Sequence, residues 1–291
     1  MEFVIYITLV LIGVCLGSFG GATVWRLRAR QLVADKKNKE PFDHKELHKL
    51  EKLTKGKVAA DRSRCLHCDY TLRWYDLIPV VSWLALRGKC RHCHKKIGYF
   101  EPLIEVGVAA FFVASYAFWP FQLDTSLEMI RFGLWLVAGV ALAMLFAYDT
   151  KWFLLPDKLT IFVVAIGIAT VAIAATQSGN PLGTIFSAIG AVGVLSGLYL
   201  VLYLVSQGKW VGFGDVKLGL ALALLLVDWQ SALVALFLAN LIGCLIVIPF
   251  MATGKLKRSS HVPFGPLMIA GAVIAQFVSP MIVSLYVGTL I

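Results

Sequence analysis

Long uncharged stretches dominate the chain and are separated by short polar segments. They occupy residues 3–25, 106–123, 132–148, 159–208, 229–254 and 262–291. A helix needs about 20 predominantly apolar residues to cross a bilayer, so most of these stretches predict one transmembrane helix each. The stretch 159–208 is too long for one helix, and its turn-forming segment Gln177-Ser178-Gly179-Asn180-Pro181 divides it into two.

A further apolar segment, 216–227, is short for a complete span. It predicts either an eighth transmembrane helix or a re-entrant half-helix. Counted as a span, it gives an all-α polytopic membrane protein with about eight transmembrane helices. We expect the first span to be retained, because it lacks the basic start of a signal peptide and is too long for its apolar core.

Composition excludes an ordinary soluble domain. Of 291 residues, 59% are hydrophobic and the mean hydropathy is +0.78, whereas soluble domains are about half apolar. The formal net charge of +10 has two interpretations: nucleic-acid binding, and basic loops held on the cytoplasmic side of a membrane. We favour the second and expect no nucleic-acid partner, because most of the 27 lysines and arginines lie between residues 26 and 96.

This charge distribution predicts the topology, because basic residues near span ends stay in the cytoplasm. The N-terminus is then outside, and three parts follow: a first transmembrane helix (1–25), a cytoplasmic loop (26–101) and a membrane domain of about seven spans (102–291). Arg131 alone falls on the outer side. The basic residues outside this loop that are also predicted to lie on the cytoplasmic side are Lys151, Lys158, Lys209, Lys217, Lys255, Lys257 and Arg258.

Two CxxC pairs form the clearest local motif of the predicted loop. Their spacing is that of a zinc ribbon, in which two short chelating turns meet around one tetrahedral ion. Four thiolates close the site to water, so we expect the zinc to be structural. Disulfides are disfavoured in the reducing cytoplasm, although a redox pair or free thiols stay open. The predicted ligands are Cys65, Cys68, Cys90 and Cys93, with His67, His92 and His94 as substitutes if one cysteine is not used.

Two aspartates at the ends of apolar segments are candidate catalytic groups. Asp215 ends the segment Gly212-Phe213-Gly214-Asp215, whose glycines lack a Cβ and let a substrate backbone approach. Asp149 ends a span, where a carboxylate is unfavourably placed against the helix macrodipole. A neutral acid at Asp149 beside an ionised Asp215 would form the pair needed for hydrolysis by water. An ion pair of Asp149 with Lys151 and a helix-capping role for Asp215 are the alternatives.

Other residues have weaker functional interpretations. Asp157 follows Pro156 and is predicted to cap a helix. Glu105 lies just inside a span, where an ionisable group usually faces protein or a water-filled cavity. Two other protein classes stay open: a proton-coupled transporter that uses the aspartates, and a zinc-ribbon membrane scaffold that needs neither. The expected substrate-binding or supporting residues are Gly212, Gly214, Lys217, Asp157 and Glu105.

Several longer segments carry a resemblance to a known family. They are Gly17-Ser18-Phe19 with Arg26-Leu27, the cysteine loop with 77–83 and 87–90, Asp149 with 155–157, 212–217 and Pro263-Phe264-Gly265-Pro266. Together they resemble the bacterial type IV prepilin peptidases, which are leader peptidases and N-methyltransferases that also serve type II secretion pseudopilins. The resemblance implies an eight-span aspartic protease of the GxGD class in the inner membrane. It further implies Asp149 and Asp215 as the catalytic pair, prepilin substrates, and S-adenosylmethionine as methyl donor.

One segment departs from that family's pattern. After Gly-Ser-Phe the family continues with a leucine-like residue and an asparagine, then Arg-Leu-Pro, whereas this chain has Gly20, Gly21 and Arg28. If the asparagine contributes to methyl-donor binding, the departure affects methylation and leaves proteolysis intact. The sequence does not identify the residues that bind the methyl donor.

Overall fold

The computed structural model describes residues 2–54, 62–254 and 262–289, and helices are the regular elements of this part of the chain. Two isolated antiparallel bridges are its only extended pairings. The predicted basic residues Lys255, Lys257 and Arg258 lie outside the described residues. The helices are α1 (Glu2–Asn38), α2 (His44–Leu50), η1 (Glu51–Thr54), η2 (Trp74–Leu77), α3 (Val81–Ala85), α4 (Phe100–Ala117), α5 (Ser126–Trp152), α6 (Asp157–Gln177), α7 (Pro181–Val192), the π-helix η3 (Gly193–Gly197), α8 (Leu198–Ser206), α9 (Phe213–Leu226), α10 (Trp229–Ala252) and α11 (Gly265–Thr289).

Within the described residues, seven helical segments are long and apolar enough to cross a membrane. The all-α fold is therefore confirmed, but the eighth predicted span is not among them. Its helix, α9, has 14 residues, which is about 21 Å at 1.5 Å per residue and short of a hydrocarbon core of about 30 Å. The seven segments are Glu2–Asn38, Phe100–Ala117, Ser126–Trp152, Asp157–Gln177, Pro181–Ser206, Trp229–Ala252 and Gly265–Leu285.

The chain forms two compact units, Met1–Ala114 and Ser115–Ile291. In the first unit, α1 and α4 approach closely through small residues. A Cβ at Gly13 would lie 2.6 Å from the Cα of Ala109, and one at Gly17 would lie 2.6 Å from the Cα of Glu105. The run of small residues that begins at Gly17 therefore serves helix packing, as its composition predicts.

The first helix continues well beyond the predicted span and ends at Asn38. Its charged last turns form a hairpin with α2, whose start is capped by Asp43 through the backbone N–H groups of Lys45 and Glu46. Arg28 pairs with Glu46 at 2.6 Å. Segment 26–54 is thus a folded hairpin with a small core, built from Ala29, Leu32, Leu47, Leu50 and Leu53.

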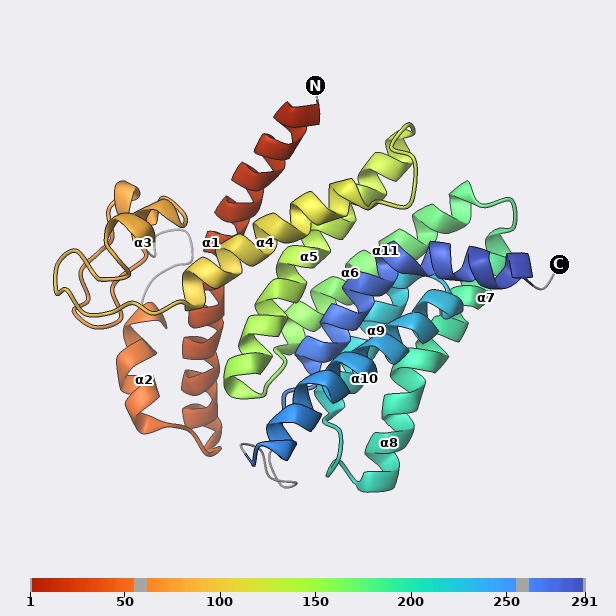
Figure 1. Cartoon of the computed structure of the whole chain (residues 1–291). Coiled ribbons are helices and arrows are strands. Elements are labelled where there is room, and N and C mark those ends of the chain that lie inside the picture. Colours follow the sequence, from red (N-terminus) through yellow and green to blue (C-terminus); the bar gives the residue numbers. More distant parts are fainter. Residues whose placement is uncertain (1, 55–61, 255–261, 290–291) are drawn as a thin grey trace. The chain divides into compact units, whose positions relative to one another are not determined.

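In the second unit, the short helix α9 is enclosed by longer ones. Its contacts are with α6, α7, η3, α8, α10 and α11 (Figure 1). Glycines allow two of these approaches: a Cβ at Gly167 of α6 would lie 2.6 Å from the Cβ of Leu224, and one at Gly219 would lie 3.0 Å from the carbonyl oxygen of Leu195. Protein therefore covers most of α9, and Asp215 lies in its first turn.

The predicted break in the long apolar run is confirmed. Helix α6 ends at Gln177, and Asn180 caps α7 by accepting the backbone N–H of Gly183 at 3.0 Å. Pro181 occupies the first turn of α7, where its missing N–H costs no hydrogen bond.

Candidate functional site

Asp149 lies in the last turn of α5 and is 5% exposed. Phe153 ends this helix in a left-handed conformation, with its N–H bonded to the carbonyl of Asp149 at 2.9 Å. The carboxylate itself accepts the backbone N–H of Gly265, the first residue of α11, at 3.1 Å. A helix N-terminus carries partial positive charge, so α11 offsets the unfavourable position of Asp149 on its own helix. The alternative partner, Lys151, has its ammonium over the ring of Trp152 at 5.0 Å.

Asp215 is held in a comparable way in the first turn of α9. Its Oδ2 accepts the backbone N–H of Gly212, the N-cap residue, at 3.2 Å. The capping interpretation is thus correct in part: Asp215 is not the N-cap but the acidic residue that reaches back to it. Its side chain is half-buried.

The structure brings the two aspartates together. The charge of Asp215 acts on the carboxyl group of Asp149. Leu155 joins the segments that carry them, since it lies 3.3 Å from a Cβ built at Gly214 and 3.5 Å from one built at Gly265. Two carboxyl groups, each fixed by one backbone donor, therefore share a partly buried site.

Gly265 belongs to this site, although the sequence shows it only within a Pro-Phe-Gly-Pro segment. A Cβ at this position would lie 2.6 Å from Oδ2 of Asp149. The residue must therefore be glycine for its N–H to reach the carboxylate. The only local signal is a glycine between two prolines just before an apolar run, which is typical of a helix start.

The other predicted residues are divided between the two units. Asp157 is not the N-cap of α6, because Pro156 has that position and Asp157 is the first helical residue. Its carboxylate instead accepts from Lys217 at 2.6 Å, in a pair whose side chains are 61% and 35% exposed. Glu105 belongs to the first unit, where it is buried and accepts the backbone N–H of Val80 at 2.7 Å.

The four predicted cysteines form one cluster in the first unit. Their sulfur atoms all lie within 4.8 Å of one another, with Cys65–Cys93 at 3.9 Å and Cys68–Cys90 at 4.0 Å. Four sulfurs at about 2.3 Å around a tetrahedral zinc are about 3.8 Å apart, so the cluster fits such an ion. The cysteines are free rather than bonded as disulfides.

Each CxxC pair forms the same turn. The N–H of Cys65 bonds to the carbonyl of Tyr70 at 3.0 Å, and that of Cys90 bonds to Lys95 at 2.9 Å. The fourth residue after each of these cysteines, Asp69 or His94, has a positive φ. Burial raises the pKa of the Cys65 thiol well above its usual range, so a thiolate there requires a compensating cation.

The substitute histidine ligands are not part of this cluster, which within the described residues contains only cysteines. His92 instead stacks on Tyr70, with ring centroids 5.0 Å apart and planes 6° from parallel. The four-cysteine site is therefore a candidate metal centre as it stands.

Fold and site together define a class: a polytopic helical membrane protein with two neighbouring carboxyl groups in its second unit and a four-cysteine centre in its first.

Comparison of the sequence with models of known protein families identifies two matching domains. Residues 11–119 match the Bacterial Peptidase A24 N-terminal domain, and residues 136–248 match the Type IV leader peptidase family. The chain belongs to the type IV leader peptidase family.

Curated relatives match over most of their length. A type 4 prepilin-like proteins leader peptide-processing enzyme from Escherichia coli O78:H11 is 31% identical over 270 residues, which cover 90% of this chain and 89% of that protein. A prepilin leader peptidase/N-methyltransferase from Vibrio cholerae is 29% identical over 282 residues, or 95% and 98% of the two chains. The Bacillus subtilis protein of the same name is 28% identical over 231 residues, or 79% and 87%. No solved structure gives a significant match.

Proposed function

We propose that this chain is a membrane aspartic endopeptidase that removes the leader peptide from type IV prepilins or type II secretion pseudopilins. Family membership supports the substrate class. The observation that carries the catalytic assignment is the pairing of Asp149 and Asp215: each is held by a glycine N–H at a helix N-terminus, and the charge of Asp215 acts on Asp149.

In the proposed mechanism, the two carboxyl groups share one proton, because two neighbouring like charges do not both ionise readily. Ionised Asp215 takes a proton from water, and the water oxygen attacks the scissile carbonyl carbon. Protonated Asp149, the more buried group, gives its proton to the carbonyl oxygen. In the tetrahedral intermediate, one hydroxyl returns its proton to Asp149 and the C–N bond breaks, while Asp215 protonates the leaving amine. No covalent enzyme intermediate forms.

Topology supports a site at the cytoplasmic edge of the bacterial inner membrane. The basic residues of segment 26–101 support a cytoplasmic position for that segment and an N-terminus on the outer side. The C-terminal end of α5 and the start of α9 then face the cytoplasm. A prepilin with its basic leader in the cytoplasm and its apolar helix in the bilayer would present the bond at that edge. Nearby acidic groups would attract the leader, with Asp157 as the exposed candidate.

A structural Zn²⁺ is the proposed occupant of the four-cysteine cluster. The sulfur separations and the four-thiolate donor set fit this ion, and they leave no position for a reacting water. Zinc would hold the two CxxC turns together, and through Leu66 it would support the small core beneath them.

Methylation of the new N-terminus is the second proposed activity, and it rests on the relatives' names, which include N-methyltransferase. S-adenosylmethionine, the methyl donor, carries a sulfonium and an ammonium group. Glu101 fits a cationic ligand: Oε1 accepts the indole N–H of Trp25 at 2.9 Å, and Oε2 is buried with no hydrogen-bond partner among the described residues. Glu101 would bind and orient the donor, which supplies the methyl group.

The deciding experiment compares purified wild type with Asp149→Asn and Asp215→Asn, which are nearly isosteric. Each variant is incubated with a model prepilin and labelled S-adenosylmethionine, and mass spectrometry follows leader loss and methyl addition. We expect both variants to lose cleavage while keeping the wild-type melting temperature. Full cleavage by either variant would end the catalytic assignment, and cleavage without methylation by wild type would end the second activity.

A further inference from the structure

Tyr199 has an unsatisfied hydroxyl deep in the second unit. The residue is the second of α8, directly after the π-helix η3, and it is 3% exposed. Its hydroxyl oxygen is buried and has no hydrogen-bond partner within the described parts of the chain. Buried polar groups are nearly always paired, since leaving one unpaired destabilises the fold. The stability of the free protein therefore does not explain why this position carries a hydroxyl group.

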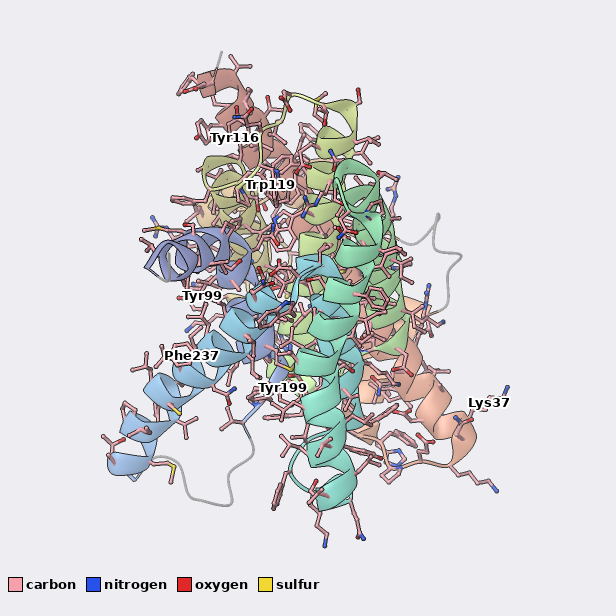
Figure 2. All side chains as sticks on the ribbon, turned by 90° about the vertical axis from the view of Figure 1, so that its right-hand side faces the viewer. Lys37, Tyr99, Tyr116, Trp119, Tyr199 and Phe237 are labelled. Carbon is pink, nitrogen blue, oxygen red and sulfur yellow. The ribbon has the colours of Figure 1, made fainter. Side chains whose placement is uncertain are left out.

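The surroundings of Tyr199 connect it to both halves of the aspartate pair. Its ring packs edge-on against Phe264 at 5.3 Å and 65°, and Phe264 directly precedes the glycine that donates to Asp149. The side chain also lies within range of the Asp215 charge. Figure 2 shows Tyr199 between α8 and α10. Asn240 of α10 lies near the hydroxyl without completing a hydrogen bond of normal geometry to it, and its amide donates to the carbonyl of Leu236 at 2.8 Å.

The π-helix before Tyr199 is fixed against the helix that carries Asp215. Ser196 donates its hydroxyl to the carbonyl of Val216 at 2.9 Å, and Gly219 lets the carbonyl of Leu195 come close to α9. These contacts fix how η3 packs along α9. Because α8 continues directly from η3, they also fix the direction in which the side chains of α8 point. π-Helical turns of this kind are frequent at functional sites.

Packing alone does not account for a tyrosine here. A phenylalanine would keep the edge-on contact with Phe264 and remove the unpaired group. The hydroxyl is a donor without an acceptor among the described residues, and the charge of Asp215, one of the two proposed catalytic groups, acts on it. An oxygen that arrives with the substrate would supply the missing acceptor.

We propose that the Tyr199 hydroxyl donates a hydrogen bond to the scissile carbonyl oxygen of the bound peptide. The proposal rests on the aspartic peptidase function and adds a substrate-contacting residue to it. As water attacks, negative charge grows on that oxygen, and a fixed donor stabilises it most in the transition state. Tyr199 keeps its proton throughout, while the proton that converts the carbonyl to a hydroxyl comes from Asp149.

The test is Tyr199→Phe in the full-length protein, with Tyr203→Phe as the matched control one helical turn further along α8. For Tyr199→Phe we expect kcat to fall on the order of 10²-fold, the loss typical of one removed oxyanion donor, with KM little changed. The melting temperature should stay equal or rise, because the variant loses an unsatisfied buried group. A peptide inhibitor with a tetrahedral hydroxyethylene group should also lose affinity for the variant, whereas the uncleaved ground-state peptide should not. Tyr203→Phe should match wild type in every measurement.

Two results would overturn the proposal. One is a Tyr199→Phe variant with kcat within about twofold of wild type, measured in steady state. The other is loss of kcat together with a clear drop in melting temperature and unchanged inhibitor affinity, which would indicate a structural role. Asp149→Asn in the same assay separates this failure from a failure of the proposed function: if Asp149→Asn is inactive and Tyr199→Phe is normal, only the assignment of Tyr199 is wrong.

Discussion

A single added methyl group at Gly265 provides a stringent test of the site. A Cβ there would lie 2.6 Å from Oδ2 of Asp149 and 3.3 Å from its Cγ. Ordinary contact between such atoms begins near 3.4 Å, so the carboxylate oxygen would have to retreat by about 0.8 Å. The backbone N–H of residue 265 remains, but its 3.1 Å hydrogen bond would lengthen beyond normal range.

The size of the effect follows from this displacement. A shift of about 1 Å in a reacting group costs on the order of 10²-fold in rate, which is about 2.7 kcal/mol of transition-state stabilisation. We therefore expect Gly265→Ala to lower kcat/KM for prepilin cleavage by roughly 10²-fold. Cleavage by detergent-purified protein, followed by mass spectrometry over a range of substrate concentrations, gives kcat and KM separately.

Two glycines in the same unit provide controls. A Cβ at Gly167 would be equally close, 2.6 Å, to the Cβ of Leu224, but this clash is in the α6–α9 packing and not at a carboxylate. A Cβ at Gly133 of α5 would meet no atom within 4 Å. Gly167→Ala should lower the melting temperature yet keep kcat per folded molecule, and Gly133→Ala should change neither. The reasoning fails if Gly265→Ala stays within about threefold of wild type, or if Gly167→Ala loses as much activity.

Two further predictions concern the metal centre and the exposed ion pair. Cys65→Ser should lower bound zinc, measured by metal analysis of the purified protein, and should destabilise the cysteine loop toward proteolysis, because three thiolates hold zinc less well than four; a full complement of zinc would contradict the site. Asp157→Ala should reduce cleavage only modestly, by a few-fold, because its pair with Lys217 is exposed and such pairs contribute about 0–1 kcal/mol. A loss as large as that of Asp149→Asn would instead give Asp157 a direct catalytic role.

Hydropathy predicts the transmembrane helices well because the cost of placing a residue in lipid is largely local and additive. The hydropathy prediction of a complete span is wrong for α9. This helix is enclosed by other helices, so its length is set by protein contacts rather than by the thickness of the bilayer. Hydropathy also misses the extension of α1 to Asn38. Lysine, arginine and leucine are good helix formers, and the hairpin with α2 covers the apolar side of these turns.

The aspartates were predictable from the sequence because each charge interrupts a long apolar region. Their environment was not. The contact between Gly265 and Asp149 joins residues 116 positions apart, and no local pattern encodes such a pairing. Tyr199 lies in an apolar run and looks like any buried aromatic residue until its hydroxyl is found without a partner. Candidate residues whose proposed roles depend on tertiary contacts could therefore be found only in the structure.

The glycines around the two aspartates serve different purposes. At Gly265 the free protein itself forbids a side chain, because Asp149 already fills the space. At Gly212 a Cβ would meet Oδ2 of Asp215 at an ordinary 3.6 Å, and the backbone φ of −77° suits any residue. At Gly214 a Cβ would meet only the flexible side chain of Leu155, at 3.3 Å. Since neither conformation nor packing demands glycine at 212 or 214, the open surface there suits an extended peptide backbone that must come within bonding distance of Asp215.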